Sequence, residues 1–258
     1  MNIMVERQPF VSVIMPCYNM ERFIADTIRS VINQTFADWE LLITDDASTD
    51  RTVAVIQSLA ENDDRIHLFT VDPQHTGIAA ARNFCIKEAK GRFFAFLDAD
   101  DLWHPDKLQR QLQFMQDNQI GFSYTAYDLV DESGKPLGKT IKAAGNLNYT
   151  AYLRNTIIGC STVMVDTEKV GPVVVPNFRT SEDTATWLNL LRQGFKAYAF
   201  NEPLTSYRIR NHSASSNKLK AATDLWKVYR QNEKLPFFKA IIFFTCYVFN
   251  AIKKRICS

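Results

Sequence analysis

Residues Phe93-Phe94-Ala95-Phe96-Leu97 form a short apolar run, and Asp98-Ala99-Asp100-Asp101 follow it directly. A run of this length predicts a buried strand, with the aspartates at its carboxyl end. The same order occurs earlier, where residues 39–43 predict a strand that stops before Asp45-Asp46. Ligands of open parallel sheets bind outside the carboxyl ends of the strands, so both acidic clusters are candidate ligand sites.

Strand and helix patterns alternate on both sides of this stretch. We predict strands at residues 11–15, 39–43, 66–71 and 92–97, and helices at about residues 24–32, 50–60 and 78–89. Asn19 and Asp50 are the expected caps of the first two helices. This alternation predicts an α/β fold, a Rossmann-like and mostly parallel sheet with helices on both faces.

The pattern is looser after Asp101. It predicts helices at residues 106–118 and 182–192 and strands at residues 121–127 and 159–165. We predict one catalytic domain over residues 1–217, with a nucleotide-binding half at about residues 9–105 and an acceptor-binding half at about residues 106–217. Residues 218–258 form a separate helical tail in this division.

Composition excludes several classes of protein. The 258 residues are 46% hydrophobic and 22% charged, enough for a full core, and the formal net charge of +2 does not favour nucleic acid as a partner. The five cysteines have no CxxC spacing and predict neither a disulfide framework nor a zinc site. GxGxxG, Walker and HExxH motifs are absent, as is the pattern of a secretory signal, and we expect a cytoplasmic protein.

The tail differs from the rest of the chain in charge. Residues 218–258 carry a formal +7, which leaves −5 on residues 1–217. Residues 237–252 are rich in phenylalanine, fall short of the ~20 apolar residues of a membrane span, and end at Lys253-Lys254-Arg255. Aromatic and basic residues together favour peripheral binding to an anionic membrane surface. The alternative is a helix that docks on the catalytic domain or on a second subunit.

Asp98 and Asp100 are candidate metal ligands. Alternate residues of an extended segment point to the same side, so the two carboxylates can face one ligand. Carboxylates crowded at one rim repel each other unless a positive charge lies between them. Mg²⁺ or Mn²⁺ suits such a place, since it binds one or two protein carboxylates and takes its other ligands from phosphate and water.

Four segments in order resemble family 2 inverting glycosyltransferases with the GT-A fold. They are residues 11–19 (Val-Ser-Val-Ile-Met-Pro-Cys-Tyr-Asn), 45–50 (Asp-Asp-Ala-Ser-Thr-Asp), 77–83 (Gly-Ile-Ala-Ala-Ala-Arg-Asn) and 96–101 (Phe-Leu-Asp-Ala-Asp-Asp). The resemblance covers about residues 9–215 and is densest up to residue 105. It implies a metal-dependent enzyme that uses a UDP-sugar and a saccharide acceptor on a polyprenyl diphosphate. Relatives of this kind build bacterial surface polysaccharides such as O-antigen or capsule, at the inner face of the cell membrane.

The resemblance also implies roles for particular residues. Pro16, Tyr18, Asp45 and Arg82 would hold the nucleotide, with Asp45 near the uracil. Asp98 would lie by the ribose or the metal, and Asp100 would coordinate the ion that bridges the diphosphate.

The catalytic base of the family belongs to a Glu-Asp pair that opens a helix, here Glu182-Asp183. Adjacent helical residues point about 100° apart, so one carboxylate faces the site and the other does not. We assign Asp183 as the base, and Glu182 and Trp187 to the acceptor or to a neighbouring group. The base deprotonates an acceptor hydroxyl, whose oxygen displaces the nucleoside diphosphate, so an α-linked donor gives a β-glycoside.

The chain departs from the family pattern at residues 207–215. Many relatives have His where this chain has Arg210. Either Arg208 or Arg210 holds the diphosphate, or His212 substitutes from a shifted position. Two other functions remain open on the sequence alone: a nucleotidyltransferase that makes nucleotide sugars, and a membrane-associated sugar-binding protein without activity.

Overall fold

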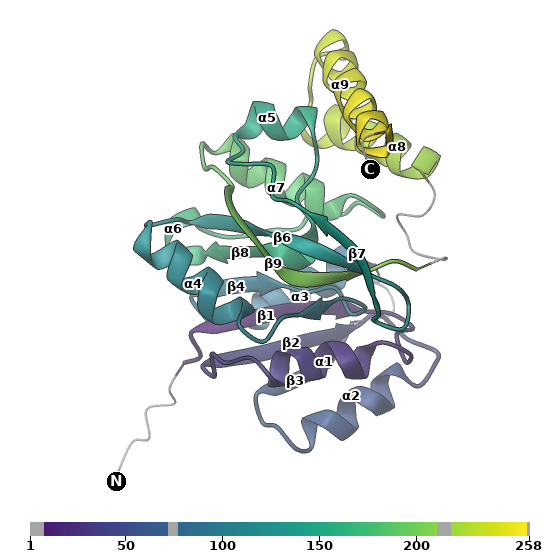
Figure 1. Ribbon diagram of the computed structural model, residues 1–258. Helices are drawn as coiled ribbons and strands as arrows, with labels where there is room; N and C mark the ends of the chain where they lie inside the picture. Colours follow the sequence, from purple (N-terminus) through teal and green to yellow (C-terminus); the bar gives the residue numbers. More distant parts are fainter. Residues whose placement is uncertain (1–7, 72–76, 211–217, 257–258) are drawn as a thin grey trace.

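The structure is a computed structural model that describes residues 8–71, 77–210 and 218–256. A mixed sheet lies at the centre, and its first half consists of parallel strands in the order β3-β2-β1-β4 (Figure 1). The elements are β1 (Val11–Cys17), α1 (Ile24–Ile32), β2 (Trp39–Asp45), α2 (Thr52–Ala60), β3 (Ile66–Thr70), α3 (Ile78–Glu88) and β4 (Phe93–Phe96). The predicted strand and helix alternation is confirmed over this half.

The second half of the sheet adds antiparallel strands to the parallel core. Its elements are β5 (Leu102–Trp103), α4 (Lys107–Asp117), β6 (Phe122–Val130), β7 (Pro136–Ile141), α5 (Tyr149–Arg154), the 3₁₀ turn η1 (Cys160–Thr162), β8 (Val163–Asp166), α6 (Thr167–Val170), α7 (Glu182–Arg192) and β9 (Tyr198–Arg208). Strand β8 runs antiparallel between β4 and β6, and β9 runs parallel to β6. The carboxyl ends of β1, β2, β4 and β9 therefore meet at one edge of the sheet.

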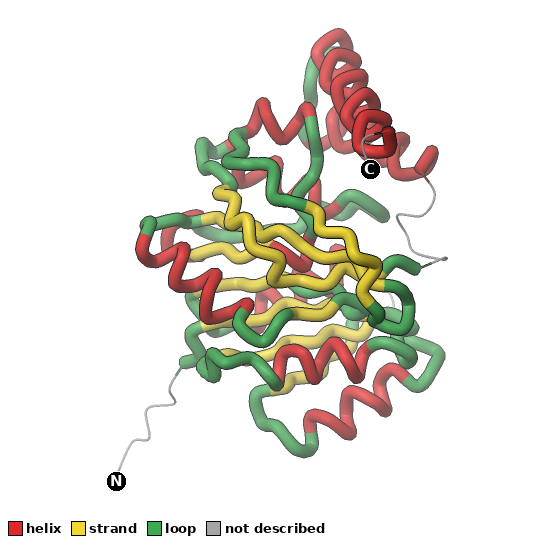
Figure 2. Tube along the Cα trace, in the orientation of Figure 1, coloured by secondary structure: helices red, strands yellow, loops and turns green. Residues whose placement is uncertain are grey.

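Helices lie on both sides of the sheet, as predicted (Figure 2). Val11, Val13 and Met15 of β1 pack into the core formed with α1 and α4, whereas Ile14 packs into the opposite core with α3, α5 and α7. Because side chains alternate along a strand, a strand covered on both faces is apolar throughout. The α/β fold expected from the sequence is confirmed, and its second half contains more antiparallel pairs than the sequence pattern indicated.

The cap predicted at Asn19 is wrong. Helix α1 begins five residues beyond Asn19, with Phe23 at the cap position, and the backbone of Asn19 is left-handed, with φ of 51°. The Asn19 side chain instead accepts a hydrogen bond from the backbone N–H of Thr49 at 2.8 Å, which ties the ends of β1 and β2 together. Asp50 does accept a hydrogen bond from the N–H of Thr52 in the first turn of α2, at 2.9 Å.

The tail forms α8 (Lys218–Lys227), a π-helical turn η2 (Val228–Asn232) and α9 (Phe237–Ile256), which lie beside α5 and away from the sheet (Figure 1). Tyr149 of α5 donates a hydrogen bond to Glu233 at 2.6 Å, and Thr180, just before α7, donates one to Asp224 of α8. The first part of the tail is thus packed onto the second half of the catalytic body. Among the described residues, no helix combines the length and the apolar character that a membrane crossing requires.

Candidate active site

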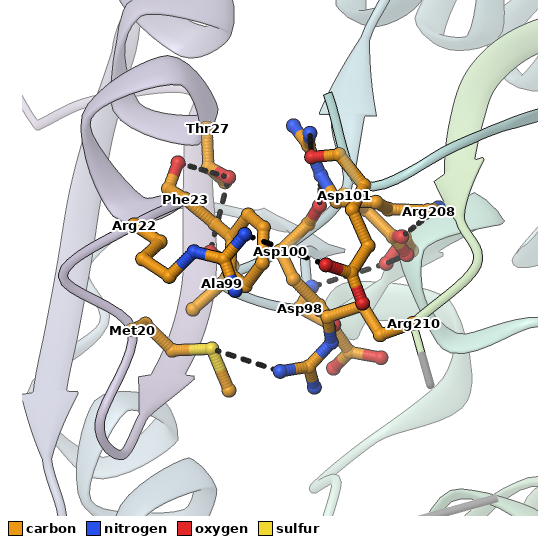
Figure 3. A network of polar contacts seen from close by, with 12 residues as sticks. Met20, Arg22, Phe23, Thr27, Asp98, Ala99, Asp100, Asp101, Arg208 and Arg210 are labelled. Carbon is orange, nitrogen blue, oxygen red and sulfur yellow. Dashed lines mark hydrogen bonds and ion pairs between the residues drawn. The ribbon is translucent and has the colours of Figure 1, made fainter. Parts of the chain in front are cut away.

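The acidic loop, residues 98–101, follows β4 at the edge where the parallel strands end. The Asp98 side chain is 32% exposed and the Asp100 side chain 15% exposed, so both carboxylates reach the surface of the protein. Asp101 is buried and accepts hydrogen bonds from the Ser161 hydroxyl at 2.6 Å and from the backbone N–H of Arg208 at 2.9 Å. Asp101 therefore holds the loop in shape, while Asp98 and Asp100 are partly exposed and pair with Arg82 and Arg210 (Figure 3).

The acidic loop brings three carboxylates close together, and burial and mutual repulsion both act on them. Burial raises the pKa of Asp100, and the neighbouring Asp98 raises it further, although Arg210 acts in the opposite direction. The pKa of Asp101 is raised well above its ordinary value, first by burial and then by Asp100 and Asp98. The loop is therefore a place where an additional cation is stabilised.

Arg82 of α3 links the acidic loop to the helix that carries the predicted base. One terminal nitrogen of its guanidinium donates to Asp98 at 2.8 Å, and the other donates to Glu182 at 2.9 Å. The arginine side chain is 2% exposed, so it lies beneath the cleft. The guanidinium that was predicted to hold the nucleotide directly is thus paired with two carboxylates.

Asp183 lies at the start of α7 and differs from Glu182 in its surroundings. Glu182 is buried against Arg82, whereas Asp183 is partly exposed and accepts a hydrogen bond from the N–H of Thr184 at 2.6 Å. Burial raises the pKa of Asp183 to about 7, with a further increase from Glu182 and a decrease from Arg82. A carboxylate whose pKa lies near neutrality is suited to accept a proton from a hydroxyl.

Three predicted nucleotide ligands lie at the ends of β1 and β2. Cys17 pairs with Asp45 in the sheet register, so Tyr18 follows β1 beside the end of β2. Tyr18 is 50% exposed, whereas Pro16 and Asp45 are buried. Asp45 accepts hydrogen bonds from the backbone N–H of Ser48 at 2.9 Å and from its hydroxyl at 2.5 Å, which fixes the turn after β2.

Arg208 and Arg210 lie at the end of β9 and close over the acidic loop. Arg208 donates from Nε to the backbone carbonyl of Asp100 at 2.7 Å, and Nε of Arg210 lies 2.6 Å from the Asp100 carboxylate. Both guanidinium groups lie against the ring of Phe23, at 5.1 Å and 5.4 Å from its centroid (Figure 3). The structure thus brings both arginines to the predicted metal ligands. His212, the third candidate, lies outside the described residues.

Trp187, which was assigned to the acceptor or the diphosphate, lies in the core of this structure. Trp187 is 1% exposed and packs edge-on against Phe96, with ring centroids 5.0 Å apart. It lies one helical turn beyond Glu182 on a face of α7 that is directed into the core. An indole at this position stabilises the fold instead of stacking on a sugar.

Two residues of the site were missed from the sequence. Phe23 lies under both arginines, and Ser161 connects Asp101 to the backbone N–H of Asp98 at 3.1 Å. Phe23 belongs to an ordinary apolar helix pattern, and Ser161 occurs in a segment predicted as a strand. Neither has a local signal, because both act through residues that are distant in the sequence.

The described residues contain no group of three or more His, Cys, Asp or Glu side chains that could hold a metal ion by themselves. Asp98 and Asp100 nevertheless fit an ion shared with a diphosphate, because Mg²⁺ and Mn²⁺ commonly take one or two protein carboxylates and complete their coordination with phosphate and water.

Comparison with known proteins agrees with this geometry. Residues 12–170 match the family described as Glycosyl transferase family 2. The chain is 48% identical over 253 residues, 98% of its own length and 100% of the relative, to the Bacillus subtilis (strain 168) protein named as the teichuronic acid biosynthesis glycosyltransferase TuaG. It is 38% identical over 246 residues, 95% of this chain and 94% of the relative, to the Escherichia coli protein named UDP-Glc:alpha-D-GlcNAc-diphosphoundecaprenol beta-1,3-glucosyltransferase WfgD.

A solved structure shares the fold. The mannosyltransferase PcManGT of Pyrobaculum calidifontis, in complex with GDP-Man and Mn²⁺, has a TM-score of 0.64 at 18% identity, over 90% of this chain and 66% of that chain. At this identity the likeness concerns the fold alone. Together with the sequence match, it confirms the GT-A fold expected above: this chain is a glycosyltransferase and belongs to glycosyl transferase family 2.

Proposed function

We propose that this glycosyltransferase moves a sugar from a UDP-sugar to a hydroxyl of a saccharide carried on a polyprenyl diphosphate, with inversion at the anomeric carbon. The observation that carries the proposal is the position of Arg82, 2.8 Å from Asp98 and 2.9 Å from Glu182. This one arginine therefore connects the acidic loop to the Glu182-Asp183 pair, which contains the proposed base. The names of the two bacterial relatives support a role in surface polysaccharide synthesis and a lipid-linked acceptor.

The donor occupies the sheet edge in this proposal. Asp45 lies near the uracil, and Tyr18 and Pro16 line the nucleotide from the end of β1. Asp98 contacts the ribose or the metal. Arg82 keeps the Asp98 carboxylate in position from beneath, because its guanidinium is already paired with that carboxylate.

A divalent ion, Mn²⁺ or Mg²⁺, would be held by Asp100 and Asp98 together with the diphosphate. When bound, it supplies positive charge that stabilises the diphosphate leaving group. The Mn²⁺ in the Pyrobaculum calidifontis enzyme supports this part of the proposal. Arg208 lies close enough to the acidic loop to add further positive charge at the same place.

Asp183 acts as the general base. Its carboxylate removes the proton of the acceptor hydroxyl, whose oxygen forms the new bond to the anomeric carbon. The bond from that carbon to the diphosphate breaks, and UDP leaves with the bonding electrons. Glu182 is held by Arg82 and orients the start of α7 instead of accepting the proton.

The experiment is a transfer assay with the purified full-length chain. A panel of UDP-sugars is incubated with an undecaprenyl-diphosphate-linked N-acetylglucosamine acceptor and Mn²⁺ or Mg²⁺, and UDP release and the extended lipid are both measured. We expect one UDP for each glycoside formed, a β-linkage by NMR, and loss of transfer when EDTA removes the metal. Formation of UTP and a sugar 1-phosphate when pyrophosphate is added to the UDP-sugar, without UDP release, would indicate a nucleotidyltransferase, and an absence of turnover with every donor would indicate a sugar-binding protein.

The tail supports a second part of the proposal, peripheral binding to the inner face of an anionic membrane. Its exposed large apolar side chains all belong to one stretch of helix: Phe237, Phe238, Ile241, Ile242, Val248 and Phe249. We call this set the α9 stripe. Residues spaced in this way lie along one side of a helix. Lys234 and Lys239 are exposed close to its first turn, and the whole tail carries a formal +7.

The charge of the tail favours lipid over a second copy of the chain. Two α9 stripes packed against each other would bring two tails of +7 together, whereas an anionic bilayer neutralises them. An interfacial position would also bring the enzyme to a lipid-linked acceptor. The other side of α9 is occupied, because Ala240 is buried and Phe244 packs edge-on against Trp226 at 5.5 Å.

Vesicle sedimentation with the full chain tests this part. Phe238→Glu should weaken binding to phosphatidylglycerol vesicles by about ten-fold or more, because it removes an aromatic ring from the apolar interface and adds a negative charge. Val174→Glu is the matched control, since Val174 is also exposed but lies outside the tail. Equal binding of both variants, or dimerisation through the tail without any vesicle binding, would contradict the membrane role.

A further inference from the structure

Arg210 forms an ion pair with Asp100, the residue that is expected to bind the divalent ion. Its Nε lies 2.6 Å from Oδ2 of Asp100, and one terminal nitrogen lies 3.6 Å from the sulfur of Met20. The guanidinium also lies 5.4 Å from the centroid of the Phe23 ring. The Asp100 carboxylate thus has a positive partner from the chain itself (Figure 3).

The two arginines at the end of β9 are held differently. Arg208 is 3% exposed and is fixed by its backbone N–H to Asp101 and by its side chain to the carbonyls of Asp100 and Glu132. The Arg210 side chain is 19% exposed and lies beyond the last paired residue of β9. The close contact of its Nε with Asp100 is a charge pair without a well-aligned hydrogen bond. Arg208 is therefore a fixed part of the site, and Arg210 is the arginine that can exchange partners.

Arg210 pairs with the carboxylate that is expected to bind the divalent ion. Two positive charges on one carboxylate repel each other, so the ion binds Asp100 well only when Arg210 leaves it. A bound diphosphate offers oxygens that accept charge-assisted hydrogen bonds from a guanidinium. The nucleotide thus supplies Arg210 with a new partner at the moment when it also supplies ligands to the ion.

We propose that Arg210 makes divalent-ion binding depend on the nucleotide: it competes with the ion for Asp100 in the free protein and moves to the diphosphate when both ligands bind. The inference rests on the proposed function, because it takes the diphosphate of a nucleotide sugar as the second partner. Its consequence is that the ion and the nucleotide strengthen each other's binding. By linkage, each ligand raises the affinity of the other by the same factor.

The experiment measures the Kd of Mn²⁺ by electron paramagnetic resonance, on the full chain, with and without saturating UDP. Arg210→Gln removes the competing charge, so we expect it to bind Mn²⁺ alone about five-fold or more tightly than wild type. UDP should then improve Mn²⁺ affinity less in this variant than in wild type. Arg210→Lys keeps the positive charge, so its Mn²⁺ dissociation constants should resemble those of wild type. This variant shows whether the tighter Mn²⁺ binding of Arg210→Gln comes from the lost charge or from the changed shape of the side chain.

Arg110→Gln is the matched control. Arg110 lies on α4 and pairs at 2.5 Å with the carboxylate of Glu202 on β9, so it does not contact the acidic loop. The control variant should leave both Mn²⁺ dissociation constants unchanged. Equal or weaker Mn²⁺ binding by Arg210→Gln without UDP would overturn the inference and leave the proposed function intact. Failure of wild type to bind Mn²⁺ even with UDP would overturn the inference and the metal-dependent function together.

Discussion

The two halves of the sheet bring residues to the cleft in different ways. In the first half, β1, β2 and β4 are parallel and adjacent, so Tyr18, Asp45 and Asp98 meet at one edge through topology alone. In the second half, the site is assembled by contacts between residues far apart in the chain. Arg82 reaches Glu182 across 100 residues, and the N–H of Arg208 reaches Asp101 across 107. The first half thus positions residues through the order of its strands, and the second half adds residues through long-range contacts.

The largest expected effect belongs to the second half, at Asp183. Asp183→Asn should lower transfer by about 10³-fold or more, because the amide cannot accept the hydroxyl proton. The measurement is UDP release at saturating donor and acceptor. Near wild-type turnover in a folded variant would remove Asp183 from the role of base.

The same variant should be more stable than wild type in alkaline solution. The folded-state pKa of Asp183 is raised from its ordinary 3.8 to about 7. This carboxyl therefore destabilises the fold increasingly as the pH rises from about 4 to 7, and by a constant amount above that range. We expect Asp183→Asn to gain about 1–3 kcal/mol at pH 8 and little at pH 4. Thermal denaturation at the two pH values tests the sign. A loss of stability at pH 8 would show that the carboxylate is stabilised by its surroundings.

In the first half, Asp100→Asn should lower transfer by about 10²-fold or more, because it removes the negative charge that we propose binds the ion. UDP binding measured calorimetrically should then lose its dependence on Mn²⁺. If UDP binding by the variant still depended on Mn²⁺, the ion would bind elsewhere. The first half of the sheet would then not provide the metal ligand.

The contact between the two halves is expected to control stability. Arg82→Met leaves Asp98 and Glu182 without their buried partner, so we expect a loss of about 3–5 kcal/mol in the free energy of unfolding. Arg110→Met, which breaks the exposed pair with Glu202, should cost less than about 1 kcal/mol in the same urea titration. Equal losses would mean that the Arg82 bridge does not hold the halves together.

The smallest effect concerns the Trp187 correction. Trp187→Phe keeps an aromatic ring against Phe96, so it should cost about 1–2 kcal/mol of stability through lost volume. The KM for the acceptor should stay within about two-fold of wild type, because the side chain is buried. A selective rise in acceptor KM without loss of stability would restore the predicted acceptor contact.

The sequence was most informative where structure depends on neighbouring residues. Strands 39–43 and 92–97 and the aspartates that follow them were predicted, because apolar runs and strand-end positions are local patterns. Helix 182–192 and its leading Glu-Asp pair were predicted for the same reason.

What could not be predicted depends on pairing across the chain. The role of Arg82 beneath the cleft needs α3 and α7 to approach each other, and no pattern near residue 82 specifies that. Strand β9 was missed because it pairs in parallel with β6, about 75 residues earlier, so no hairpin turn marks it. The Trp187 error has a related cause: the spacing of an aromatic on a helix indicates a face, but not whether that face is covered.

We propose that Asp183 accepts the acceptor's proton at a site to which both halves of the sheet contribute residues. The most direct test is the pH dependence of kcat/KM for wild-type transfer between pH 5 and 9, at fixed saturating Mn²⁺. Because the base is active when ionised and its pKa is raised to about 7, the account predicts a rate that climbs with pH and levels off above about pH 8. A rate that is flat across this range, or that falls as the pH rises through 7, would contradict it.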